Sequence, residues 1–176
     1  MTLAVLTPRW KGSPNYTAGR GVYRPTAIVI HIAEGTAASV DSWFANPDSN
    51  VSAHYLVTKT GALHQYVREE DTAWHAGRID RPTWKGLVRD AHGEIVNPNR
   101  YTIGIEHEGG ANDPWPDLMY ERSARLLAEL HCRWSIPLDR AFVVGHREIF
   151  SRKTCPGARV DLDKLITLAR GILGVL

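Results

Sequence analysis

The sequence predicts a single α/β domain in which α-helices flank a mostly buried β-sheet. Two observations favour this fold class. Short apolar, β-branched segments alternate along the chain with stretches in which apolar residues recur every three or four positions, as strands and amphipathic helices do. The chain has 176 residues, 43% of them hydrophobic, which is enough for one domain with its own core. We expect an irregular N-terminal arm over residues 1–25 and the main domain over residues 26–176.

The arm is rich in glycine and proline and carries basic side chains without any acidic one. This composition is typical of irregular structure. Two interpretations stay open: a solvated tail, or a segment that contacts anionic polymers at a cell surface. The basic residues are Arg9, Lys11, Arg20 and Arg24.

The first elements of the domain follow from local patterns. Residues 26–32 are β-branched and continuously apolar, which predicts a central strand covered on both faces. Thr36 is a candidate N-cap for a short helix, and the Asn-Pro pair at 46–47 ends it. Residues 55–58 and 63–67 flank a Thr-Gly turn and predict a β-hairpin.

The second half of the chain contains a loop, two strands and two helices. Residues 77–100 have no clear periodicity and predict a long surface loop. Residues 101–106 and 139–145 have strand patterns. The helix with the strongest pattern spans residues 117–134, with apolar residues along one face, and a closing helix is predicted over residues 160–173.

Composition excludes several classes of function. The formal net charge of +2, with basic and acidic residues mixed along most of the chain, gives no argument for a nucleic-acid partner. No apolar run approaches the ~20 residues of a membrane span. The first residues have neither the basic region nor the apolar length of a secretory signal, so we expect synthesis in the cytoplasm without a signal peptide. In that compartment Cys132 and Cys155 are not expected to form a disulfide.

Candidate metal ligands close two of the predicted strands. His31 ends the first strand, His146 follows the last one, and Cys155 lies in a Thr-Cys-Pro-Gly loop just downstream. In open α/β sheets, ligands bind beyond the carboxyl ends of the strands. Two imidazoles and one thiolate leave a fourth position free for water, which is the pattern of a catalytic Zn²⁺ site.

Two further residues are candidates for catalysis beside the metal. Glu106 ends a third strand, where a carboxylate can accept a proton from water. Lys153 precedes Cys155 by two residues, so its ammonium can help to hold an oxyanion, unless it is an ordinary solvated lysine. Weaker candidates for lining a substrate groove are His54, Trp74, His75 and Arg152, although Trp74 fits the core equally well.

The chain resembles the type 2, zinc-dependent N-acetylmuramoyl-L-alanine amidases, which include phage endolysins and bacterial enzymes that recycle anhydro-muropeptides. The resemblance covers almost the whole chain. It rests on residues 28–31 (IVIH), 51–57 (VSAHYLV), 73–77 (AWHAG), 103–106 (IGIE) and 145–157 (GHREIFSRKTCPG), which stand in the order and spacing of the family. It implies a central mixed β-sheet flanked by α-helices, zinc bound by His31, His146 and Cys155, and catalytic assistance from Glu106 and Lys153.

The resemblance also implies the reaction: cleavage of the amide bond between N-acetylmuramic acid and L-alanine in peptidoglycan. One branch of the family has a tyrosine before the residue matching His54, where this chain has Ala53. The recycling branch usually has aspartate at the position of Cys155, so the chain is more similar to the endolysin branch. We therefore expect a monomeric phage or prophage endolysin that acts on the cell wall after release from the cytoplasm.

Three other readings stay open at this point. The first is a cytosolic muropeptide-recycling amidase. The second is a module that binds peptidoglycan without cutting it. The third is a structural zinc domain in which His54 or His75 supplies a fourth ligand and closes the site to water.

Overall fold

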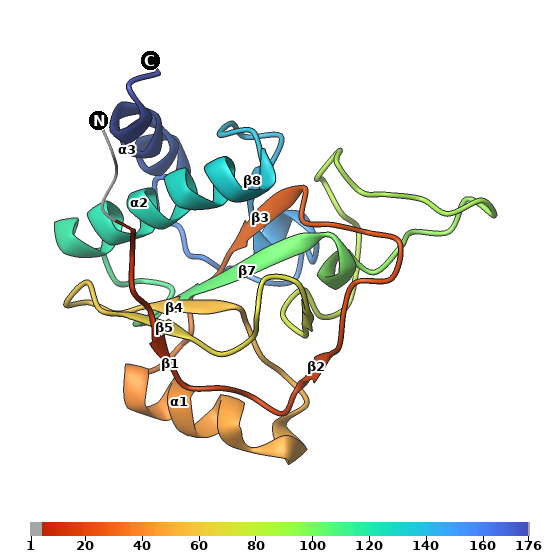
Figure 1. The fold of residues 1–176 in the computed structure, drawn as a ribbon, viewed down its shortest axis with the longest axis horizontal. Helices are drawn as coiled ribbons and strands as arrows, with labels where there is room; N and C mark the ends of the chain where they lie inside the picture. Colours follow the sequence, from red (N-terminus) through yellow and green to blue (C-terminus); the bar gives the residue numbers. More distant parts are fainter. Residues whose placement is uncertain (1–4, 176) are drawn as a thin grey trace.

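The computed structural model describes residues 5–175 and has a central six-stranded sheet with helices on both faces (Figure 1). The strand order is β1-β5-β4-β7-β3-β8, and β2 pairs with β6 in a separate two-stranded sheet. The strands are β1 (Arg9–Trp10), β2 (Tyr16–Thr17), β3 (Ala27–Ile30), β4 (Tyr55–Val57), β5 (Leu63–Gln65), β6 (Thr72–Ala73), β7 (Thr102–His107) and β8 (Val143–Gly145).

The sheet is mixed, as the resemblance implies. β4, β7, β3 and β8 run parallel to one another, whereas β5 runs antiparallel to β4. Ile30 of β3 is paired with Ile105 of β7 on one side and with Gly145 of β8 on the other. The residues that follow these three are His31, Glu106 and His146, so the register brings the candidate ligands and the candidate base to one edge of the sheet.

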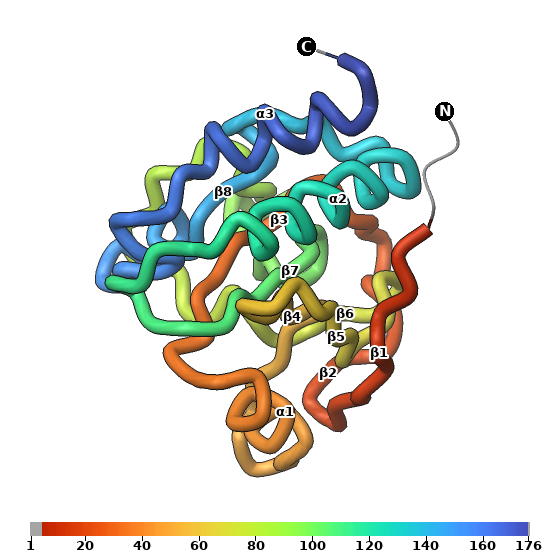
Figure 2. Tube along the Cα trace, turned by 90° about the vertical axis from the view of Figure 1, so that its left-hand side faces the viewer, coloured from red at the N-terminus to blue at the C-terminus, as the bar shows by residue number. Residues whose placement is uncertain are grey.

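The helices form two layers, with α2 (Asp117–Trp134) and α3 (Leu162–Leu173) on one face of the sheet and α1 (Ala37–Ala45) on the other (Figure 2). Side chains from β3 and β7 alternate between the two faces. Ile28 and Ile30 pack in the core with α2 and α3, while Val29 packs with Trp84 of the long loop on the opposite face. The edge that carries His31, Glu106 and His146 therefore belongs to a sheet that is covered on both faces.

Local sequence signals account for most element boundaries. The hydroxyl of Thr36 accepts a hydrogen bond from the Ser39 amide at 3.2 Å and caps α1. The α2 helix has the bounds that its apolar pattern predicts. The last strand is shorter than predicted, because the amides of Phe142 and Val143 both bond to the carbonyl of Asp139 and form a turn there. The closing helix begins at Leu162, where the Asp161 side chain caps it.

The described part of the N-terminal arm, residues 5–25, lies against the domain. Most of it is irregular, and two short strands attach it: β1 to β5, and β2 to β6. Arg20 is 5% exposed and donates hydrogen bonds to the carbonyls of Glu69, Asn99, Arg100 and Thr102. Lys11 pairs with Asp41 at 2.5 Å. Two of the arm's basic side chains, Arg20 and Lys11, are therefore engaged in contacts within the protein. Within residues 5–175, no helix combines the length and the apolar character of a membrane span.

Candidate metal centre and substrate cleft

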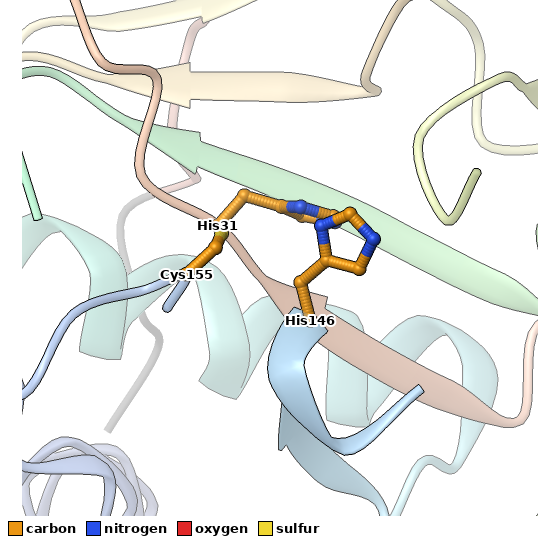
Figure 3. A group of neighbouring side chains, drawn as sticks. All are labelled: His31, His146 and Cys155. Atoms are coloured by element: carbon orange, nitrogen blue, oxygen red, sulfur yellow. The ribbon is translucent and has the colours of Figure 1, made fainter. Parts of the chain in front are cut away.

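Three side chains from distant parts of the sequence converge at the edge of the sheet (Figure 3). His31 follows β3, His146 opens the short 3-10 turn after β8, and Cys155 comes from the next loop. Their ligand atoms all lie within 4.8 Å of one another. A Cβ atom on Gly145 would lie 2.7 Å from Cδ of Pro156, so glycine at this position lets the cysteine loop approach β8 closely.

A chain of hydrogen bonds fixes which nitrogen of His31 is free. Nε2 of His31 lies 3.1 Å from Nδ1 of His75, and Nε2 of His75 lies 3.1 Å from the Thr102 hydroxyl. That hydroxyl donates to the carbonyl of Pro98 at 2.7 Å, so it accepts from His75. It follows that Nδ1 of His75 is an acceptor, that Nε2 of His31 carries the proton, and that Nδ1 of His31 keeps its lone pair for a ligand.

In His146, too, the nitrogen that is free for a ligand is Nδ1. Its Nε2 lies 3.0 Å from the carbonyl oxygen of Ala76, which can only accept, so Nε2 carries the proton and Nδ1 is free. Both imidazoles thus offer Nδ1. A metal-binding histidine usually donates its other nitrogen to a carbonyl or a similar acceptor, and both histidines do so here.

The electrostatics of the three ligands suit a cation. Burial lowers the pKa of His31 well below its ordinary value and that of His146 to about 4, so both rings are neutral at pH 7. Burial raises the pKa of the Cys155 thiol, whose sulfur accepts a hydrogen bond from the Ile32 amide at 3.2 Å. A bound divalent cation would reverse this effect and favour the thiolate.

Glu106 stands beside the three ligands. Its Oε1 lies 3.9 Å from Nδ1 of His31, and its Oε2 is buried without a hydrogen-bond partner among residues 5–175. Burial raises the pKa of the carboxyl to about 8, and the nearby charge of Lys153 partly opposes this rise. A buried oxygen of this kind is normally satisfied by a water molecule, an ion or a polar ligand. Two neutral imidazoles, a sulfur and this carboxylate fit a divalent metal ion such as zinc.

The centre lies in a cleft with a volume of about 860 Å³. Trp74, Lys153 and Arg152 line it, together with the three ligands and Glu106. The indole of Trp74 donates to the Thr17 hydroxyl at 3.1 Å, and Arg152 is largely exposed and pairs with Asp80 at 2.8 Å. One wall of the cleft is apolar and consists of Val40, Trp43, Phe44 and Val51.

Trp43 is a residue of the cleft that the sequence pattern does not indicate. It lies on α1 one residue before the buried Phe44, and its side chain is 55% exposed. In the sequence, its spacing of three residues from Val40 is equally typical of a core position. Only the exposure of the ring in the cleft identifies it.

His54 does not line the cleft, contrary to the prediction from the sequence. It is completely buried, and its Nδ1 accepts a hydrogen bond from the Gly104 amide at 3.0 Å. Its Nε2 lies 2.8 Å from the Arg20 guanidinium. His54 therefore joins the arm to β7 and cannot touch a substrate.

His75 is among the residues that line the cleft, as predicted, and it also contacts His31. Both of its ring nitrogens are engaged, one with His31 and the other with Thr102. It therefore has no nitrogen left for a metal ion. Since His54 is buried outside the cleft, neither histidine can close the centre as a fourth ligand.

Comparison with known proteins gives concordant matches. The sequence profile of the N-acetylmuramoyl-L-alanine amidase family matches residues 21–158. The chain is 39% identical over 124 residues to N-acetylmuramoyl-L-alanine amidase A of Achromobacter lyticus, which covers 69% of this chain and 58% of that protein. The chain thus spans less than two thirds of the length of this curated relative.

Two solved structures share the fold over almost the whole chain. One is a derivative of AmpD. A curated relative with that name, from Haemophilus influenzae, is described as 1,6-anhydro-N-acetylmuramyl-L-alanine amidase AmpD. The solved AmpD derivative is 27% identical, with a TM-score of 0.73 and coverage of 96% of this chain and 99% of that one. The other is a mutant endolysin from Bacillus subtilis, 26% identical, with a TM-score of 0.65 and the same coverage.

Proposed function

This chain belongs to the N-acetylmuramoyl-L-alanine amidase family, and from that premise we propose that it is a zinc-dependent peptidoglycan hydrolase. The proposed reaction is hydrolysis of the amide bond between N-acetylmuramic acid and the L-alanine of the stem peptide. The observation that carries the proposal is the convergence of His31, His146 and Cys155 within 4.8 Å in the lining of a cleft, with Glu106 beside them.

Each residue of the site has a distinct role in the proposed amide hydrolysis. Zinc held by His31, His146 and Cys155 would polarise the scissile carbonyl and acidify the attacking water. Glu106 accepts the proton of that water and passes it to the alanine nitrogen as the carbon–nitrogen bond breaks. Burial raises the pKa of the Glu106 carboxyl to about 8, and a divalent cation at the three ligands would lower it again, so that the deprotonated carboxylate can act as the base near neutral pH. Lys153 stabilises the negative charge that develops on the carbonyl oxygen.

The proposed biological role is that of a phage or prophage endolysin. The likeness to the Bacillus subtilis endolysin and the presence of cysteine as the third ligand support this role. In this role the protein is a monomer made in the cytoplasm, and it acts on the cell wall after release.

The alternative role is that of a cytosolic amidase that recycles muropeptides. The likeness to AmpD, with the higher TM-score of 0.73, favours it. The two roles differ in substrate, because an endolysin cuts polymeric cell wall whereas a recycling enzyme cuts soluble 1,6-anhydro fragments. Comparing rates on purified sacculi and on an anhydro-muropeptide therefore separates them.

The activity itself is tested by digesting purified sacculi and identifying the products by mass spectrometry. We expect stem peptides with a free L-alanine amino group and glycan strands without peptide. Treatment with a chelator should stop the release, and added zinc should restore it. Binding to sacculi without any released peptide, in the presence of zinc, would instead identify a peptidoglycan-binding module.

A further inference from the structure

We propose that residues 75 and 76 form an orienting support for both metal-binding histidines, with His75 as a positioning residue of the metal centre. This inference rests on the proposed metal site and adds an assignment to it. The side chain of His75 holds His31, and the main chain of Ala76 holds His146. One short segment between β6 and the long loop thus sets the direction of both Nδ1 atoms.

The His75 side chain can act on His31 in only one way. Because the Thr102 hydroxyl gives its proton to the Pro98 carbonyl, it accepts from Nε2 of His75, and Nδ1 of His75 becomes the acceptor for His31. Rotation of the His31 ring would break this bond inside a site where its side chain is only 2% exposed. A buried donor that loses its partner destabilises the site, so the ring is held in one orientation.

Hydrogen bonds to Asn99 hold residues 75 and 76 in place. The side-chain oxygen of Asn99 accepts hydrogen bonds from the amides of both His75 and Ala76, at 3.1 and 2.7 Å. Asn99 lies in the 3-10 turn η2 (Pro98–Arg100), the same turn whose Pro98 carbonyl ends the hydrogen-bond chain from His31. The main chain and the side chain of His75 are therefore both tied to one turn.

The neighbouring strand β7 has a glycine where the His75 ring packs against it. A Cβ atom on Gly104 of β7 would lie 2.3 Å from Cγ of His75. Real Cβ atoms do not approach other atoms so closely, so the imidazole packs directly against the backbone of the strand. Glycine at position 104 and histidine at position 75 are thus parts of one arrangement.

The proposal predicts a loss of metal affinity when the acceptor at position 75 is removed. His75→Leu removes it, whereas His75→Asn keeps a carbonyl oxygen close to the place of Nδ1. Changes to groups that orient metal ligands typically cost 10- to 100-fold in affinity. We expect a loss of that order for His75→Leu and recovery of most of it for His75→Asn.

The measurement is zinc affinity, determined by competition with a chromophoric chelator on purified metal-free protein. A second readout is the visible absorption spectrum of the cobalt-substituted protein, which reports ligand geometry. The matched control is His64→Leu. This change also removes a nearly buried imidazole, one bonded to Asp41 at 2.9 Å, but it lies outside the cleft lining. We expect the control to keep the affinity and the cobalt spectrum of the natural protein.

A milder pair of variants tests the same chain if His75→Leu does not fold. Thr102→Val preserves shape but removes the hydroxyl that accepts from His75, whereas Thr102→Ser keeps it. We expect weaker zinc binding for Thr102→Val and near-normal binding for Thr102→Ser.

The outcomes separate this inference from the proposed function. If the natural protein binds no zinc, the metal site itself is wrong. If the natural protein binds zinc and the folded His75→Leu or Thr102→Val variant binds it equally tightly with an unchanged cobalt spectrum, only the positioning role is overturned. Equal losses in His75→Leu and His75→Asn would also contradict it, because the acceptor would then be irrelevant.

Discussion

Oε1 of Glu106 lies 3.9 Å from Nδ1 of His31, the ring nitrogen that the hydrogen-bond network leaves free for a metal ion. The two residues follow directly paired positions on the adjacent parallel strands β3 and β7. The register of the sheet therefore holds a carboxylate beside a ligand position without any loop in between. This arrangement suits a proton acceptor for a water molecule at the centre.

Replacing Glu106 by glutamine should separate catalysis from metal binding. The amide cannot accept the water proton, so we expect kcat to fall by roughly 10²–10⁴-fold while zinc stays bound. The measurements are the rate of peptide release from sacculi and the zinc content of the purified variant. A variant that keeps the full rate at saturating zinc would show that Glu106 is not the base.

Replacing Cys155 by serine should weaken the stabilisation that zinc gives to the fold. A ligand present at about 100 times its Kd stabilises the native state by about 2.7 kcal/mol, and serine is a poor substitute for a thiolate. We expect zinc to raise the melting temperature of the natural protein and to raise that of the variant much less. Cys132→Ser is the matched control, because Cys132 is exposed and belongs to no ligand cluster in the described chain. An equal zinc response in both variants would remove Cys155 from the ligand set.

Replacing Trp43 by alanine should weaken substrate binding more than the chemical step. Trp43 is 55% exposed on the apolar wall of the cleft, and its indole carries no group that could accept the water proton. Losing its contact surface should raise KM on soluble glycan–peptide strands about tenfold, or ~1.4 kcal/mol, with kcat largely retained. Leu118→Ala is a suitable control, since Leu118 is 56% exposed on α2 and outside the cleft lining. A fall in kcat with unchanged KM would contradict a binding role.

Glu69 should make stability depend on pH. Burial raises the pKa of its carboxyl, but hydrogen bonds from Arg133, Tyr55 and Trp134 outweigh burial and hold the pKa below its ordinary value. A carboxyl whose pKa is depressed by folding stabilises the folded state above its unfolded pKa, near 4.3. This contribution is lost as the pH falls through the lower pKa of the folded state.

Glu69→Gln isolates that contribution. We expect the variant to be about 1.5–3 kcal/mol less stable at neutral pH, because it loses hydrogen bonds to a charged group. The difference between the two proteins should shrink as the pH is lowered below the ordinary pKa of glutamate, near 4.3. Urea unfolding of both proteins across this range measures it. A difference that stays constant with pH would show that the charge of Glu69 does not contribute.

The ends of the central strands could be predicted from the sequence, because an apolar run followed by an ionisable residue is recognised from neighbouring residues alone. His31, Glu106 and His146 each follow such a run, and the parallel register then brings them together. The bounds of α2 were equally predictable from its apolar face. These are features that residues near one another in the chain determine.

The roles of His54 and His75 could not be predicted, because they depend on contacts between distant segments. His54 meets Arg20 from the arm, and His75 meets His31 and the bare backbone at Gly104. In the sequence each is a histidine in a motif of the family, and nothing local distinguishes a substrate contact from an internal one. The exposure of Trp43 likewise depends on how α1 is placed against the sheet.

The order of the ligands along the chain has a consequence for biosynthesis. His31 is made early, but Cys155 is made only shortly before α3, whose side chains complete the core on that face. While the polypeptide is still being translated up to that point, it lacks a complete zinc site. A metal ion could therefore be held by all three side chains only after residue 155 has left the ribosome, whatever the earlier strands have already formed.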